Sequence, residues 1–221
     1  MPVATLRGLA GLVAGSIFIL LAAAAAFTRG NSDVDAALAN VRAAQSVAKE
    51  AESFRAAVAR ERARVHTRLD AARTAVVLAG RAAGTDPDGL TEARHEQGLA
   101  DDQAAAADAK MQYASDLVAL RRQESDLRQA ELDLARARAD LERHDRLAEK
   151  VPDRSLDRED FARAARVAET DTRQKRTAVE TTRTAVETSE RSWRNIWQRA
   201  DVAARLAGES TAEATPPRPV D

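Results

Sequence analysis

Apolar side chains recur every seventh residue over most of the chain. In the middle of the sequence one such row runs from residue 99 to residue 148, and similar rows run over residues 44–79 and 179–200. Because a sustained seven-residue period is typical of helices that pack as coiled coils, the pattern predicts long coiled-coil helices. The rows consist of Ala44, Ala51, Val58, Val65, Ala72 and Ala79; of Leu99, Ala106, Tyr113, Leu120, Leu127, Leu134, Leu141 and Ala148; and of Val179, Val186, Trp193 and Ala200.

Proline and glycine interrupt this rhythm at two places. Residues 80–89 (GRAAGTDPDG) contain Pro87, and residues 149–157 (EKVPDRSLD) contain Pro152. Because proline cannot continue a helix, and Gly and Asp favour turns, both segments are predicted to be loops. The helices are then expected at residues 32–80, 90–149 and 157–207. Their expected N-caps are Asn31, Ser32 or Asp33 for the first helix, Thr91 for the second and Asp157 for the third.

The sequence before the first of these helices contains a long run without charge. Residues 8–27 read GLAGLVAGSIFILLAAAAAF, and a helix of about 20 residues spans the roughly 30 Å hydrocarbon core of a bilayer. Arg7 and the N-terminal amine precede the run, which favours a cytoplasmic N-terminus with the rest of the chain outside. A signal peptide cleaved among the alanines of residues 22–26 is the alternative, but the length of the run favours an uncleaved anchor.

Together these patterns predict an all-α protein in three parts. Residues 1–30 are the membrane anchor, residues 31–208 form an extracytoplasmic antiparallel coiled coil, and residues 209–221 are a disordered tail that ends in a Pro-rich stretch. Short loops fold consecutive helices antiparallel, which gives either a hairpin or a three-helix up-down-up bundle.

Charge supports the antiparallel arrangement. Lys and Arg outnumber Asp and Glu by 9 to 6 in residues 32–82 and by 13 to 10 in residues 150–208, whereas residues 85–149 carry 9 basic and 16 acidic residues. An acidic middle helix between two basic helices is complementary across both contacts. The whole chain carries a net charge of -1, which gives no general attraction to nucleic acid. Its 51 alanines and its aromatic content of 3% suit narrow helix contacts better than a wide core.

The residues needed for catalysis or for metal binding are scarce. The absence of cysteine excludes disulfides, thiolate zinc sites and cysteine nucleophiles. The histidines, His66, His95 and His144, are isolated in sequence, and His95 lies on a charged face that favours a solvated side chain. No glycine-rich phosphate-binding loop is present. We therefore expect no catalytic residue, no metal, no cofactor and no enzyme activity.

The only two tryptophans lie close together. Trp193 and Trp197 are four residues apart, so they share one face of the third helix. Large amphipathic rings of this kind either anchor a protein partner or close the end of a bundle core, and the sequence leaves both interpretations open.

Residues 135–170, around Pro152, resemble the tip of the α-helical hairpin in membrane fusion proteins, the periplasmic adaptors of the haemolysin D type. Arg143 and Leu147 match the Arg and Leu that end the ascending helix in that family, and Ser155 matches, one residue late, the Ser that opens the descending helix. The resemblance implies a tip that docks onto an outer-membrane channel, with Arg143, Leu147 and Ser155 at the contact. The sequence lacks the strand-rich segments of the family's lipoyl and β-barrel modules.

The combined interpretation is a non-enzymatic, single-pass protein of the bacterial inner membrane that acts as a coiled-coil scaffold or spacer outside the cytoplasm. Its use of arginine over lysine is typical of GC-rich bacterial genomes. An adaptor-like component of an efflux or secretion system is the alternative, as is a stalk or spanin-like coupling protein of the envelope. Protein partners are expected in each case, and the sequence leaves open whether the chain forms a homo-oligomer.

Overall fold

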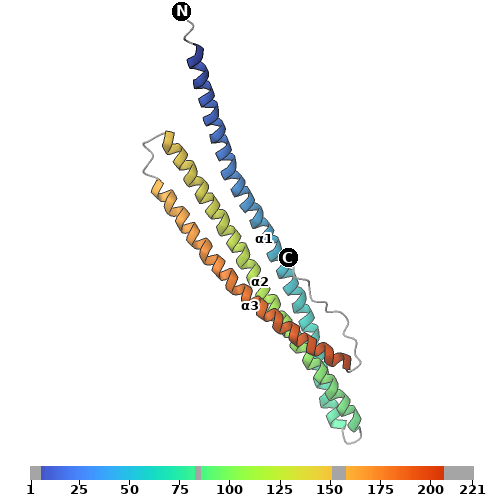
Figure 1. The fold of residues 1–221 in the computed structure, drawn as a ribbon. Helices are drawn as coiled ribbons and strands as arrows, with labels where there is room; N and C mark the ends of the chain where they lie inside the picture. Colours follow the sequence, from blue (N-terminus) through green and yellow to red (C-terminus); the bar gives the residue numbers. More distant parts are fainter. Residues whose placement is uncertain (1–5, 83–85, 151–157, 207–221) are drawn as a thin grey trace, which may run out of the picture. The chain divides into compact units, whose positions relative to one another are not determined.

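The computed structural model describes the backbone of residues 6–82, 86–150 and 158–206, and the side chains of residues 32–82, 86–150 and 158–205. It contains the helices α1 (Leu6–Ala82), α2 (Pro87–Lys150) and α3 (Arg158–Leu206), which Figure 1 shows. The described residues contain no strand. The predicted all-α class is therefore confirmed, and the ends of α2 and α3 lie within a residue of the predicted ends.

The start of α2 differs from the prediction. Asp86 caps the helix, because its Oδ1 accepts a hydrogen bond of 3.0 Å from the backbone N–H of Gly89. Pro87 is the first helical residue, where the missing N–H costs nothing because no helical carbonyl is available to it. The expectations that residues 87–89 belong to a loop and that Thr91 is the N-cap are therefore wrong. The hydroxyl of Thr91 donates instead to the carbonyl of Pro87, one turn back, at 3.3 Å.

The start of α1 also differs. The expected N-caps Asn31, Ser32 and Asp33 lie inside a helix that begins at Leu6. Polar residues of this kind cost only a few tenths of a kcal/mol each inside a helix, and no proline is present to break it. The third expected N-cap, Asp157, lies outside the described residues, as do residues 151–156 of the predicted second loop.

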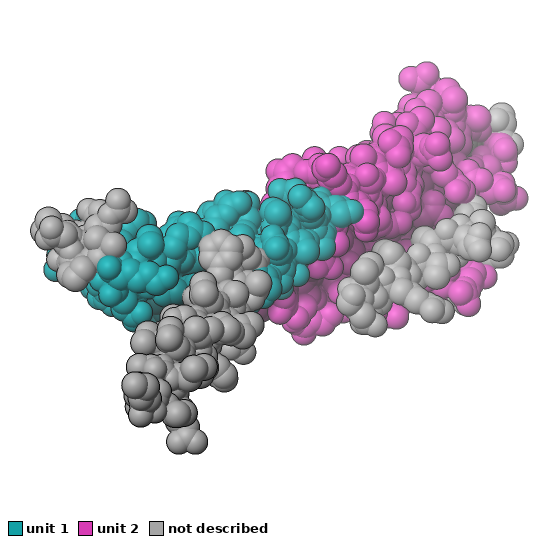
Figure 2. Space-filling view, turned by 90° about the horizontal axis from the view of Figure 1, so that it is seen from above, with its two compact units in different colours: residues 1–46, 123–178 teal, residues 47–122, 179–221 magenta. Residues whose placement is uncertain are grey.

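Contacts divide the chain into two compact units, which Figure 2 colours separately. The first unit comprises residues 1–46 and 123–178, and the second comprises residues 47–122 and 179–221. Each unit contains a part of all three helices.

In the second unit, ion pairs show that α1 and α2 are antiparallel. Residues 52, 61 and 73 of α1 bond to residues 122, 110 and 101 of α2, so the numbers rise along one helix as they fall along the other. The pairs are Glu52 with Arg122 at 2.7 Å, Glu61 with Lys110 at 2.7 Å, and Arg73 with Asp101 at 3.1 Å. The sign of the charge on α1 thus changes along this contact.

In the first unit, α2 and α3 form an antiparallel hairpin. Arg158 at the start of α3 pairs with Asp145 at 2.7 Å, and Arg176 pairs with Glu131 at 3.3 Å. Close to the second pair, the buried hydroxyl of Thr172 lies 2.8 Å from the carbonyl of Ala168, in its own helix, and 3.3 Å from that of Ala130 across the contact. Consecutive helices therefore alternate in direction, as the sequence predicts.

The predicted rows form the core. All four members of the α3 row are buried in the second unit, and in the α2 row burial is nearly complete up to Leu127 and partial from Leu134 onward. Alanines supply much of the remaining core, for example Ala104 and Ala114. Small side chains at these positions let the helix backbones approach closely, so each residue buries little apolar area.

Among the residues whose side chains the structure describes, no helical stretch is long and apolar enough to cross a membrane. The backbone of residues 8–27 belongs to α1, but the side chains of this predicted anchor lie outside the described residues. The predicted tail, residues 209–221, lies outside them as well.

Candidate functional site

Trp193 occupies an aromatic layer in the core of the second unit, which we define as Phe54, Tyr113 and Trp193. Each helix contributes one ring. Trp193 is only 2% exposed and stacks on Tyr113, with 5.5 Å between ring centroids and an angle of 8° between the ring planes. Phe54 meets Tyr113 edge-on, at 6.3 Å and 74°. Stacked and edge-on pairs are the favoured arrangements of aromatic rings, so the layer holds all three helices together.

Polar groups border this layer. The Lys110 Nζ lies 5.9 Å from the centre of the Trp193 ring and 2.7 Å from the Oε2 of Glu61, so one ammonium group contacts both α1 and α3. Burial raises the pKa of Tyr113, and the nearby carboxylate of Glu190 adds to the shift. The buried Nε1 of Trp193 finds no hydrogen-bond partner among the described residues. The indole of Trp193 is thus enclosed by its own chain.

The other predicted partner-binding residues lie elsewhere. Trp197 is half-buried on α3 of the second unit, one turn beyond Trp193. Arg143 and Leu147 lie near the end of α2 in the first unit, where Arg143 pairs with Asp140 at 3.2 Å and Leu147 is 44% exposed. Ser155 lies outside the described residues. Arg143 and Leu147 are both exposed near the end of α2 in the first unit, whereas the aromatic layer belongs to the second unit.

The histidines have three different environments. His95 is exposed, as expected from its charged face. His66 lies 2.9 Å from the Oδ1 of Asp108, which also accepts a hydrogen bond from Arg62. Burial acts to raise the pKa of Asp108, but the hydrogen bonds from Arg62 and His66 outweigh it and lower that pKa. His144 is buried and packs against Phe161, with 5.2 Å between ring centroids.

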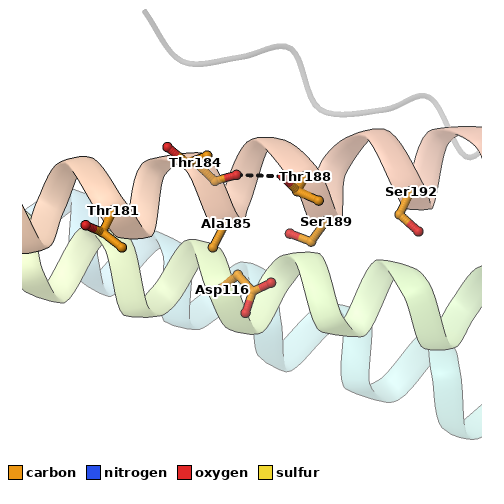
Figure 3. A pocket seen from close by; sticks show the side chains of 7 residues that line it. All are labelled: Asp116, Thr181, Thr184, Ala185, Thr188, Ser189 and Ser192. Atoms are coloured by element: carbon orange, nitrogen blue, oxygen red, sulfur yellow. Dashed lines mark hydrogen bonds between the residues drawn. The ribbon is translucent and has the colours of Figure 1, made fainter.

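An open groove lies between α2 and α3 in the second unit (Figure 3). We call it the α2–α3 groove; it has a volume of about 610 Å³ and opens widely to solvent. It is lined by Asp116 of α2 and by Thr181, Thr184, Ala185, Thr188, Ser189 and Ser192 of α3. One oxygen of Asp116 accepts a hydrogen bond of 2.9 Å from the amide of Gln112. A groove this open does not enclose a small molecule.

Few groups with catalytic chemistry come together in the described parts of the chain. No three His, Asp or Glu side chains among the described residues gather closely enough to hold a metal ion. The hydroxyls in the groove stand beside a single carboxylate and no histidine lines it.

No family model, no curated protein and no solved structure matches this chain.

Sequence reasoning missed the groove and the bridging role of Lys110. The seven-residue rows place Tyr113 and Trp193 in the core but do not show that they face each other. Antiparallel pairing with the apolar rows aligned could have predicted that contact. Lys110 is not a member of an apolar row, so the sequence pattern does not predict its contacts with Glu61 and with the ring of Trp193.

Proposed function

We propose that this protein is a membrane-anchored coiled-coil scaffold or spacer of the bacterial cell envelope, without enzyme activity. Its N-terminal segment, residues 8–27, crosses the inner membrane, and the helices after it extend outside the cytoplasm. The proposal rests on the apolar N-terminal run together with the long helices that follow it.

The observation that carries the proposal is the continuity of α1. This helix runs from Leu6 to Ala82, so the apolar run of residues 8–27 and the first helix of both units are one element. A continuous helix transmits position and force better than a flexible linker does. At about 1.5 Å per residue, the stretch from residue 28 to residue 82 would hold the far end of α1 roughly 80 Å from the bilayer.

The contacts of the described helices support a mechanical role. Many of their charged side chains pair within a helix or with the neighbouring helix, as Arg122 does with Glu52 and Arg176 with Glu131. The α2–α3 groove is shallow and open. Such surfaces suit contact with other proteins along an extended support.

A membrane-extraction experiment tests the anchor. We expect the full chain, produced in a bacterial host, to stay in the membrane pellet after carbonate washing and to begin at Met1 or Pro2. Changing Ile17 and Ile19 to Arg should release it, because each arginine near the centre of a span costs about 2.5–3.5 kcal/mol. The matched control changes Ala56 and Ala57, which are both exposed on α1, to Arg and should stay in the pellet.

Two results would contradict the anchor. The unaltered chain could appear in the carbonate supernatant, or its mature N-terminus could lie between residues 24 and 28, as cleavage of a signal peptide requires.

A second experiment separates a spacer from an adaptor. In an alternating bundle the loop around Pro152 turns back toward the membrane, whereas an adaptor tip must point away from it. A fluorophore at Leu147→Cys should therefore be quenched more strongly by nitroxide lipids than one at Leu78→Cys; both side chains are exposed. The adaptor alternative predicts the reverse order.

A further inference from the structure

One exposed stripe of α3 in the second unit carries positive charge and no acidic residue. Its members lie within about 60° of Thr188 around the helix axis, at about 100° per residue. All of them are exposed, and Arg191 and Arg199 are the charged ones. We call this stripe the outer face of α3; it consists of Thr181, Thr184, Ala185, Thr188, Arg191, Ser192, Asn195, Arg199 and Val202.

The two arginines of the outer face are held by their own helix alone. Each Nε donates to a backbone carbonyl one turn back, Arg191 to that of Glu187 at 3.2 Å and Arg199 to that of Asn195 at 3.3 Å. Neither guanidinium forms an ion pair with another described residue, whereas the neighbouring Arg194 pairs with a carboxylate. The outer face therefore offers two positive charges to an acidic group that lies outside the described residues.

Hydrogen bonds within α3 make the rest of this face less polar than its sequence indicates. The Thr188 hydroxyl donates to the carbonyl of Thr184 at 2.8 Å, and the Thr184 hydroxyl donates to the carbonyl of Glu180 at 3.2 Å (Figure 3 shows the first of these). A hydroxyl bonded to its own helix needs no other partner, so these threonines can offer their methyl groups. With Ala185 between them, most of the surface of the α2–α3 groove is apolar.

We propose that the chain's own tail, residues 209–221, folds back over the outer face of α3. The tail contains three acidic residues and one basic residue, so its charge is opposite to that of the face. A second copy of α3 fits the face less well, because a parallel pair would bring Arg191 and Arg199 toward their own counterparts. The unpaired arginines and the composition of the tail thus favour this segment as the occupant.

The tail starts beside the face and is long enough to cover it. The last helical residue is Leu206, and Gly208 follows it, where glycine readily adopts the left-handed conformation with which many helices end. In an extended polyproline-type conformation, residues 209–221 span about 37 Å at about 3.1 Å per residue. The helix rises by about 32 Å from Thr181 to Val202, so the two lengths match.

Folding back at this point brings the opposite charges together. An extended chain places Glu213 about 12 Å beyond Glu209. The same distance along α3 corresponds to about eight residues. If the tail turns back near the end of α3, Glu213 therefore lies at the height of Asn195, between Arg191 and Arg199.

The second half of the tail contains Pro216, Pro217 and Pro219, which in this alignment lie over the methyl groups around Thr188. Because proline restricts its own backbone before any contact forms, ordering this part of the tail costs less entropy than ordering a free chain. The contact need not be strong, since a short connection gives an effective concentration of about 1 mM. At that concentration a contact with a Kd of about 0.1 mM is about nine-tenths occupied.

Disulfide trapping in the full chain tests the contact, and the absence of native cysteine leaves no background reaction. Mild oxidation of a chain with Ala185→Cys and Pro217→Cys should give a closed monomer, because a disulfide needs Cα atoms within about 7 Å. The control combines Pro217→Cys with Glu187→Cys, which is also exposed and lies two residues away but about 160° around the helix. A tail without a preferred face reaches both positions equally. We expect a severalfold higher yield at position 185, and equal yields would overturn the proposal.

Charge reversal tests what holds the tail. Adding Arg191→Glu and Arg199→Glu to the chain with cysteines at positions 185 and 217 should lower the yield of closed monomer severalfold. Adding Glu209→Arg and Glu213→Arg as well should restore it, because the two charges are then exchanged. A yield that ignores the first change, or that the second does not restore, would overturn the role of the charges.

A matched control reverses two other exposed arginines of the second unit. Arg55→Glu with Arg60→Glu on α1 makes the same change in net charge and should leave the yield unaltered. Thermal melting followed by circular dichroism checks that each variant still folds, as expected for exposed positions. A disulfide-linked dimer in place of the closed monomer would overturn the proposal in favour of a contact between copies. Because the contact lies within one chain, none of these outcomes depends on whether residues 8–27 cross a membrane.

Discussion

Trp193→Ala is expected to lower the free energy of unfolding by about 3–5 kcal/mol, the usual cost of replacing a buried large aromatic by alanine. The indole is 2% exposed and stacks on Tyr113, so its removal leaves a cavity between all three helices of the second unit. About 0.5–1.5 kcal/mol of that cost comes from the lost stacking. At about 2–4 °C per kcal/mol for a chain of this size, the melting temperature should fall by roughly 6–20 °C.

Trp193→Phe separates the ring from the indole N–H. Phenylalanine keeps a ring against Tyr113 and removes a buried donor that has no partner among the described residues. Leaving such a donor unsatisfied costs about 1–3 kcal/mol, which offsets part of the loss caused by the smaller ring. We therefore expect Trp193→Phe to cost less than about 1.5 kcal/mol.

Urea unfolding of the full chain, followed by circular dichroism at the helical minimum, measures both effects. The dependence on urea concentration should keep its slope while its midpoint moves. Trp197→Ala is the matched control, because Trp197 is only half-buried on the same helix. A Trp193→Ala chain no less stable than Trp197→Ala would show that the aromatic layer does not hold the second unit together.

Two further predictions concern individual contacts. Leu132→Ala, at a side chain 2% exposed, should cost about 2–5 kcal/mol in thermal unfolding, whereas Leu147→Ala, at one 44% exposed, should stay within about 0.5 kcal/mol. Asp108→Asn should destabilise the chain modestly at pH 7, because the lowered pKa of Asp108 means that its ionised form is favoured in the folded state. That difference should shrink as the pH falls below the ordinary value of 3.8 and through the lowered pKa, as urea unfolding at pH 7 and pH 3 would show. An equal difference at both pH values would contradict the role of its bonds to Arg62 and His66.

The sequence predicts the core of this protein better than the ends of its helices. Every member of the row from Val179 to Ala200 is buried, because a period of seven residues places side chains on one stripe of a helix whatever the details of packing. Helix starts depend on single residues instead. Pro87 is compatible with a loop and with a first helical turn, and only the hydrogen bond from the Gly89 N–H to the Asp86 carboxylate distinguishes them.

Surface function was harder to predict for a related reason. Trp193 and Trp197 are equally prominent in the sequence, yet one is enclosed and the other is half-buried, because burial depends on which neighbouring helix each ring meets. Net charge predicts that α1 and α2 attract each other, but it cannot show which charges face which. The structure places Glu52 and Glu61, which oppose the net charge of α1, at the contact.

Along its contact with α2, α1 contributes acidic residues first, Glu52 and Glu61, and then the basic Arg73. This change in the sign of the charge disfavours misaligned pairing of the two helices. A seven-residue apolar row is unchanged when one helix slides past its neighbour by seven residues, so the hydrophobic effect alone scarcely penalises a misaligned chain. The ion pairs do penalise it. After such a slide Glu61 would meet Gln103 or Leu117 in place of Lys110, and Arg73 in one direction would meet Arg94.

Each exposed pair is worth at most about 1 kcal/mol, so the pairs add little to the strength of the bundle. They contribute to the specificity of the alignment instead, because a misaligned hairpin loses several ion pairs at once and can gain a repulsion. In a chain whose core is largely alanine, the charges along α1 and α2 therefore favour one alignment of the two helices over those shifted by seven residues.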